Sequence, residues 1–129
     1  MKPGLEPGVS TEIDFVVSDE MRPIFDKVAV HQVCATWSLV HFMELAGRKI
    51  LMQYLEPDEE GVGSHVTIDH IAPARVGRTV RVVATVEEVD ERRLVCDVDA
   101  FVGSRKVAAG KTVQHVFPRA ALQRILDRE

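Results

Sequence analysis

Several features are missing from this 129-residue sequence, and each absence argues against a class of protein. No apolar run reaches the roughly 20 residues that a membrane-spanning helix requires, so we expect no membrane partner. The first ten residues, MKPGLEPGVS, lack the apolar segment of a secretory signal peptide, so we expect a cytoplasmic protein. Basic residues are not in excess: the formal charge is -4 and the pI is about 5.7. This balance argues against a nucleic-acid partner.

Cysteines and metal-binding motifs are equally scarce. Cys34 and Cys96 are the two cysteines, and both lie in apolar runs without CxxC spacing, so we expect reduced thiols. Cys34 could be a nucleophile, but no basic partner is predictable nearby, and a small buried hydrophobe is the favoured interpretation. HExxH and HxH spacings are absent, and His65 and His70 should point to opposite faces of one strand. We therefore expect neither a metal nor another cofactor.

The composition that remains is that of a globular protein, with 46% hydrophobic and 28% charged residues. A chain of this length suits a single domain, here residues 1–129, which can bury a core without disulfides. The residue pattern predicts one long helix that begins at Ala35 or Thr36, continues to about Tyr54 and ends before Pro57. Alternating residues predict strands near 12–17, 65–70, 79–86, 94–102 and 106–116, a short helical turn over 19–24, a loop over 26–35 and a tail helix over 119–128.

One long apolar helix followed by a run of antiparallel strands indicates an α+β protein. A single sheet wrapped around such a helix resembles the hotdog fold. This sheet would have open edges and one uncovered face, and covering them usually requires a second copy of the chain. We therefore expect a homodimer.

Glu44 is the one charged residue between Val33 and Ala46, in the stretch ATWSLVHFMELAG. A solvated ion pair with Arg48, four residues on, is one interpretation. The apolar neighbours favour the other, in which the carboxylate is buried because chemistry requires it there. His41, three residues earlier on the same side of the helix, is either a packing residue or a substrate-binding residue.

His70 continues the inward face of Val66 and Ile68, so its imidazole should point towards the helix. It is either a core histidine with one nitrogen satisfied or an acid, base or hydrogen-bond donor. A carboxylate and an imidazole that face each other are a common means of activating water or a nucleophile.

Three stretches, ATWSLVHFMELAG, MQYLEPDEEGVG and SHVTIDHIAPARVG, resemble the fluoroacetyl-CoA thioesterase-like family of hotdog acyl-CoA thioesterases. The resemblance extends from about Phe15 to Val116. It implies hydrolysis of an acyl-CoA substrate, with Thr36, Glu44 and His70 as the catalytic set. It also implies that Gly63 lies close to the thioester.

Thr36 and Glu44 are eight residues apart, which corresponds to a rise of about 12 Å if both are helical. Their side chains could not then meet, so either Thr36 lies on a loop that folds back or the site uses both subunits of a dimer. The second arrangement is favoured. Thr36 could also be the N-cap of the helix, and this role is compatible with a role in the catalytic set.

The segment IFDKVAVHQVCAT has no aromatic residue after Phe25, whereas the family is rich in phenylalanine before its threonine. We therefore expect a small or medium acyl group that is not specifically fluoroacetyl. Four arginines, Arg75, Arg78, Arg81 and Arg105, could meet the phosphates of coenzyme A, although a solvated surface is the commoner role. An acyl-CoA hydratase or dehydratase and a non-catalytic acyl-CoA binder are the alternative functions.

Overall fold

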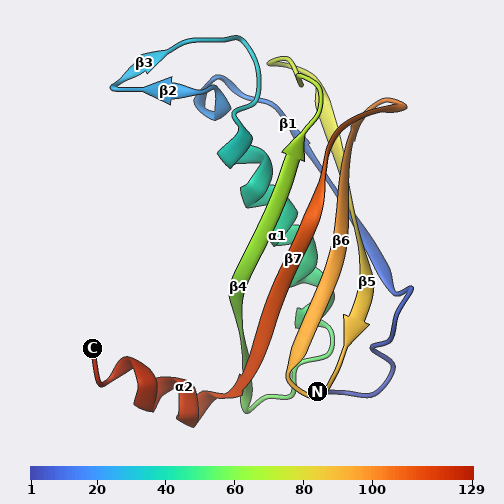
Figure 1. Ribbon diagram of the computed structural model, residues 1–129, viewed down its shortest axis with the longest axis vertical. Coiled ribbons are helices and arrows are strands. Elements are labelled where there is room, and N and C mark those ends of the chain that lie inside the picture. Colours follow the sequence, from blue (N-terminus) through green and yellow to red (C-terminus); the bar gives the residue numbers. More distant parts are fainter.

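The computed structural model describes residues 1–129 and has one long helix held in the curve of a five-stranded antiparallel sheet (Figure 1). The sheet order is β1-β5-β6-β7-β4, and a separate hairpin, β2-β3, lies beyond the start of α1. The elements are β1 (Ser10–Val16), the 3-10 turn η1 (Asp19–Met21), β2 (Ile24–Phe25), β3 (Val28–Ala29), α1 (Thr36–Met52), β4 (Glu59–His70), β5 (Thr79–Val89), β6 (Arg93–Val102), β7 (Arg105–Pro118) and α2 (Arg119–Leu126).

The core lies between α1 and the concave face of the sheet. Alternate residues of β5 and β6 point inward, as their period of two requires, and are almost completely buried. The helix contributes Leu39, Met43, Ala46 and Ile50, which recur at the three- and four-residue spacing of one helical face. The predicted α+β arrangement, a sheet wrapped around one helix, is therefore confirmed.

The convex face of the sheet is polar, which corrects the expectation that this face needs a cover. Lys111 bonds to the carboxylates of Glu87 and Asp97, and Lys106 lies 3.2 Å from Asp99. Hydrogen bonds to Asp97 and Glu87 raise the pKa of Lys111 above its usual range. A solvated charged face such as this one does not require a second copy of the chain.

Strand β4 is different, because it lies at the edge of the sheet and pairs only with β7. It is 12 residues long, and a bulge between Gly63 and His65 interrupts its register. The outer edge of β4 therefore presents backbone groups that have no partner strand in this chain.

Residues 26–35 were predicted to be loop, and this prediction is wrong at Val28–Ala29, which form β3 and pair with β2. Asp26 and Lys27 have positive φ angles of 48° and 69° and form the two-residue turn of the β2-β3 hairpin. Such a turn matches the twist of the strands that it joins. It was missed because its sequence lacks the usual Asn-Gly or Asp-Gly pair.

Candidate active site

Thr36 and His70 meet at the start of α1. The hydroxyl Oγ1 of Thr36 lies 2.8 Å from Nδ1 of His70. Thr36 is the first helical residue and Ala35 is the N-cap, so the N-cap prediction for Thr36 is wrong. His70 is the last residue of β4, and its side chain shares the inward face with Ile68. The adjacent ends of α1 and β4 thus bring together residues that are 34 positions apart in the sequence.

The imidazole of His70 has one nitrogen still to satisfy. Nδ1 is used by Thr36, while Nε2 is buried and has no hydrogen-bond partner within the chain. A buried polar nitrogen without a partner is costly, and such groups in a native protein call for an explanation. A group that is absent from the isolated chain, such as substrate, would explain it.

Glu44 lies further along α1, beside Gly63 of β4. A Cβ added to Gly63 would stand only 3.0 Å from Oε2 of Glu44, so the glycine is what leaves space at the carboxylate. The side chain of Glu44 is exposed in the isolated chain, which contradicts the prediction that it is buried there.

The alternative role for Glu44, an ion pair with Arg48, is also wrong. The Arg48 guanidinium donates to the carbonyl of Gly61 at 2.8 Å and to the carboxylate of Glu60 at 2.9 Å. That bond from Arg48 is the main cause of a lowered pKa at Glu60. Glu44 is therefore left without a cationic partner and free to act on a bound molecule.

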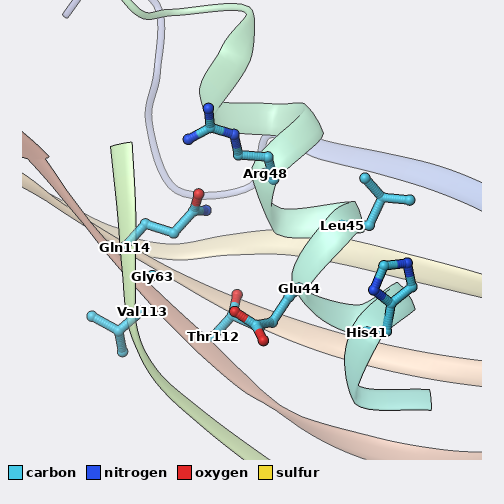
Figure 2. Close-up of a pocket in the computed structure, with 8 residues that line it drawn as sticks. All are labelled: His41, Glu44, Leu45, Arg48, Gly63, Thr112, Val113 and Gln114. Atoms are coloured by element: carbon cyan, nitrogen blue, oxygen red, sulfur yellow. The ribbon is translucent and has the colours of Figure 1, made fainter. Parts of the chain in front are cut away.

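A cavity of about 310 Å³ opens between α1 and the strand pair β4-β7 (Figure 2). His41, Glu44 and Arg48 line it from the helix, and Gly63 lines it from β4. Three of the predicted site residues, His41, Glu44 and Gly63, thus lie around one cavity. Leu45, Thr112, Val113 and Gln114 complete the wall.

Thr112 and Gln114 of β7 were missed by sequence reasoning. They are 2% and 6% exposed, and they are the buried polar residues of this structure. The sequence carried no clear signal for them, because their alternate set in the predicted strand also holds Lys106 and is no more apolar than the opposite set. Their burial beside the helix shows that this face is the inward one.

The structure does not bring Thr36 and Glu44 together. Both are helical, and eight residues of helix separate them by about 12 Å along the axis. Thr36 and His70 form one group at the end of β4, and Glu44 and Gly63 form another near its middle. Each chain therefore contributes two separate groups.

Aromatic residues do lie at the start of α1, although the preceding segment is poor in them. The rings of Phe25 and Trp37 pack edge to face with centroids 5.5 Å apart. They are 58% and 50% exposed, and Val28 and Val30 of the hairpin region are similarly exposed. The chain thus leaves an apolar surface next to Thr36.

Two other candidates are not part of this arrangement. Burial raises the pKa of Cys34 to about 11, so its thiol is protonated at neutral pH and is a poor nucleophile. Arg81 pairs with Glu12 at 3.2 Å, and Arg105 donates to the carbonyl of Pro73 at 2.7 Å. Both cysteines are free, as predicted.

No helix in the structure is long and apolar enough to cross a membrane.

The fold and these residues define a class of protein, the hotdog thioesterases. A Thermus thermophilus protein of the thioesterase superfamily superposes with a TM-score of 0.92 at 37% identity, covering 98% of this chain and 93% of that one. The solved fluoroacetyl-CoA thioesterase FlK superposes with a TM-score of 0.88 at 26% identity, covering 98% of both chains. The fluoroacetyl-CoA thioesterase of Streptantibioticus cattleyicolor is 32% identical over 116 residues, which is 85% of this chain and 84% of that one.

Residues 17–120 match the model of the fluoroacetyl-CoA-specific thioesterase family. The chain belongs to this family and is a thioester hydrolase with the hotdog fold. The family resemblance and the hotdog fold predicted from the sequence are confirmed.

Proposed function

We propose that this protein hydrolyses acyl-CoA thioesters to a free acid and coenzyme A. The observation that carries the proposal is the carboxylate of Glu44, which faces Gly63 in a cavity and has no cationic partner. A solved relative, a variant of FlK, binds fluoroacetate and coenzyme A, and it aligns with 92% of this chain at a TM-score of 0.82. This similarity supports an acyl-CoA substrate for the present cavity.

The site is completed by a second copy of the chain in this proposal. The unpaired edge of β4 can pair with β4 of a partner in antiparallel fashion around a two-fold axis. Ser64 is the extra residue of the bulge, so along the paired positions of β4 Gly63 and His70 are each three steps from Thr67, which is their midpoint. An axis there would place Gly63 and Glu44 of one chain opposite His70 and Thr36 of the other.

The exposed surfaces support this pairing. The apolar residues near the start of α1, Phe25, Val28, Val30 and Trp37, would be covered, at least in part, by the partner. Glu44 would then lie at the interface, away from bulk water. The expectation of a buried carboxylate would thus hold in the dimer, although it does not hold in the isolated chain.

The reaction needs a nucleophile, an acid and a site for the developing oxyanion. Glu44 takes a proton from water, whose oxygen adds to the thioester carbonyl carbon. The first N–H groups of α1, which have no partner within the helix, hold the carbonyl oxygen as it becomes negative. When the C–S bond breaks, the hydrogen-bonded pair of Thr36 and His70 carries a proton to the sulfur of coenzyme A. The carboxylic acid formed gives up its own proton to solvent, and the proton that Glu44 took from water passes to the Thr36–His70 pair, which restores both groups.

We further propose that the acyl group is small or medium and not specifically fluoroacetyl. The β2-β3 hairpin and the residues up to Thr36 carry aliphatic side chains after Phe25, including Val28 and Val30. Between Phe25 and Thr36 this segment therefore offers no aromatic face for a small polar acyl group.

Release of free thiol from a panel of acyl-CoAs, from acetyl and fluoroacetyl to long-chain, tests the proposed function. Hydrolysis of at least one small or medium member is expected, without strong preference for fluoroacetyl-CoA. A preference of a hundredfold or more for fluoroacetyl-CoA would overturn the proposed acyl range. Binding of acyl-CoA without turnover would indicate a binding protein, and addition of water to an enoyl-CoA in place of thiol release would indicate a hydratase.

A further inference from the structure

The cavity beside Glu44 has a polar floor that hydrolysis alone does not require. Thr112 and Gln114 of β7 line it opposite the helix, and both side chains are more than nine-tenths buried (Figure 2). Of its eight lining residues, Leu45 and Val113 are the hydrophobic ones. The surface that the cavity exposes is nevertheless mostly apolar, and a few polar groups set in such a wall are how small-molecule sites fix the orientation of a ligand.

The hydroxyl of Thr112 is buried, and the thiol of its cross-strand neighbour Cys96 is only a weak partner for it. The hydroxyl lies beneath Gly47 of α1, where a Cβ would stand 2.8 Å from Oγ1 of Thr112 and 3.4 Å from Nε2 of Gln114. The two polar groups therefore lie near one another under the helix. A buried hydroxyl with only a weak thiol partner keeps bonding capacity that a neighbouring polar group can use.

The position of Gln114 relates it to the reacting carbon. Gln114 is the cross-strand partner of Gly63, which lies against the carboxylate of Glu44. Paired residues on antiparallel strands have Cα atoms about 4.5–5.5 Å apart. A substituent two or three bonds from the thioester carbonyl is thus within reach of the Gln114 amide.

We infer that the acyl group carries a hydrogen-bonding substituent near the thioester, such as a hydroxyl on the third carbon, and that Gln114 with Thr112 selects it. The inference rests on the proposed function and narrows its substrate class. A site built to bond a substrate hydroxyl discriminates strongly against the analogue that lacks it, because its own polar groups are then left unpaired.

The test compares 3-hydroxybutyryl-CoA, as both enantiomers, with butyryl-CoA, because these substrates share the coenzyme A part and the chain length. The wild type should hydrolyse one enantiomer with a kcat/KM at least about tenfold above that of butyryl-CoA. Gln114→Met keeps the size of the side chain and should abolish this preference by lowering the value for the hydroxylated substrate about tenfold. Thr112→Val should reduce the preference in the same direction. Gln53→Met, at the exposed end of α1, is the matched control and should change neither value.

Two kinetic results would overturn the inference, and a third would overturn the proposed function. Equal kcat/KM values for the two substrates in the wild type would show that the polar floor holds only water. An equal loss on both substrates in Gln114→Met would show that the amide contacts coenzyme A rather than the acyl group. Absence of hydrolysis with every acyl-CoA would instead refute the proposed function. In that case calorimetric titration with the same two acyl-CoAs tests the inference separately. Equal affinities for the two ligands contradict it. A tenfold higher affinity for the hydroxylated ligand, which disappears in Gln114→Met, supports it.

Discussion

The hydroxyl of Thr36 lies 2.8 Å from Nδ1 of His70, whereas Glu44, eight residues further along the same helix, contacts neither of them. One chain therefore holds a threonine-histidine pair at the end of β4 and a carboxylate-glycine pair near its middle. Thr36 should accordingly matter through its hydroxyl and not through its bulk. Thr36→Val should lower kcat about 10²–10⁴-fold with the fold intact, which is the usual range for loss of a positioned proton-transfer group. Thr36→Ser keeps the hydroxyl and should retain far more activity, and equal activity in the two variants would exclude the role given to this pair.

Gly63→Ala should impair the enzyme without unfolding it. The added Cβ would stand 3.0 Å from Oε2 of Glu44, so the carboxylate must shift slightly from its position in the cavity. The φ angle of Gly63 is not in the left-handed region, so alanine brings no backbone strain there. We expect kcat to fall at least about tenfold, since small displacements of a catalytic group have large effects. Ser64→Ala, the neighbouring substitution, should leave kcat nearly unchanged, and steady-state kinetics of both variants checks this.

Gly47→Ala should destabilise the wild-type protein but stabilise a Thr112→Ala variant. In the wild type the new Cβ would stand 2.8 Å from Oγ1 of Thr112, and overpacking of this kind costs about 1–3 kcal/mol. In a Thr112→Ala background the clash is gone, and alanine is favoured over glycine in a helix by up to about 1 kcal/mol. Urea unfolding of the four proteins in this double-mutant cycle measures the coupling. If the two substitutions change the free energy of unfolding additively, the side chain of Thr112 is not the reason that position 47 requires glycine.

Glu60 should make stability depend on pH in the acid range. The hydrogen bond from Arg48 holds the pKa of Glu60 below its usual value, so its contribution to stability is complete above about pH 4.3 and is lost as the pH falls through the lower folded-state pKa. Glu60→Gln should therefore be less stable than the wild type at pH 7 and equal to it near pH 3. The exposed pair of Glu88 and Arg93 contributes little, so Glu88→Gln should follow the wild-type curve at both pH values. Thermal unfolding across this range distinguishes the two variants.

The sequence predicted the parts of the fold that follow from local periodicity. The long helix ends at Met52, within two residues of the predicted Tyr54, and the inward face of β4 from Val66 to His70 is as predicted. Local pattern could not reveal that the hairpin turn at Asp26 and Lys27 adopts positive φ angles, because neither residue is glycine or asparagine.

The candidate site was only partly predictable, for a different reason. Thr36, Glu44 and His70 were predicted as the catalytic set and remain a prediction. The expectation that Glu44 is buried assumed that its apolar neighbours in the sequence would surround it. In the chain itself Leu39, Met43 and Ala46 turn one face of α1 to the sheet, while Glu44 stays exposed on the other. In the proposed dimer the partner chain would cover that second face, and periodicity within one chain does not encode such contacts.

The dimer can be checked before any kinetics. Two chains of 14.4 kDa should give a mass of about 29 kDa by light scattering with size-exclusion chromatography. Trp37→Asp should shift the mass towards that of a single chain, because it places a charge in the exposed apolar surface at the start of α1. Lys49→Asp, also on α1 and exposed, is the control and should remain dimeric. A single-chain mass for the wild type at all concentrations would contradict the two-chain site.

The most direct test of this account mixes two inactive variants, Glu44→Gln and His70→Ala. If each site takes Glu44 from one chain and His70 from the other, a mixed dimer has one site with both residues intact and one with neither. Random exchange of equal amounts makes about half of the dimers mixed, so thiol release should recover to about a quarter of the wild-type rate. No recovery after complete subunit exchange, with each variant folded and dimeric, would contradict a site shared between two chains.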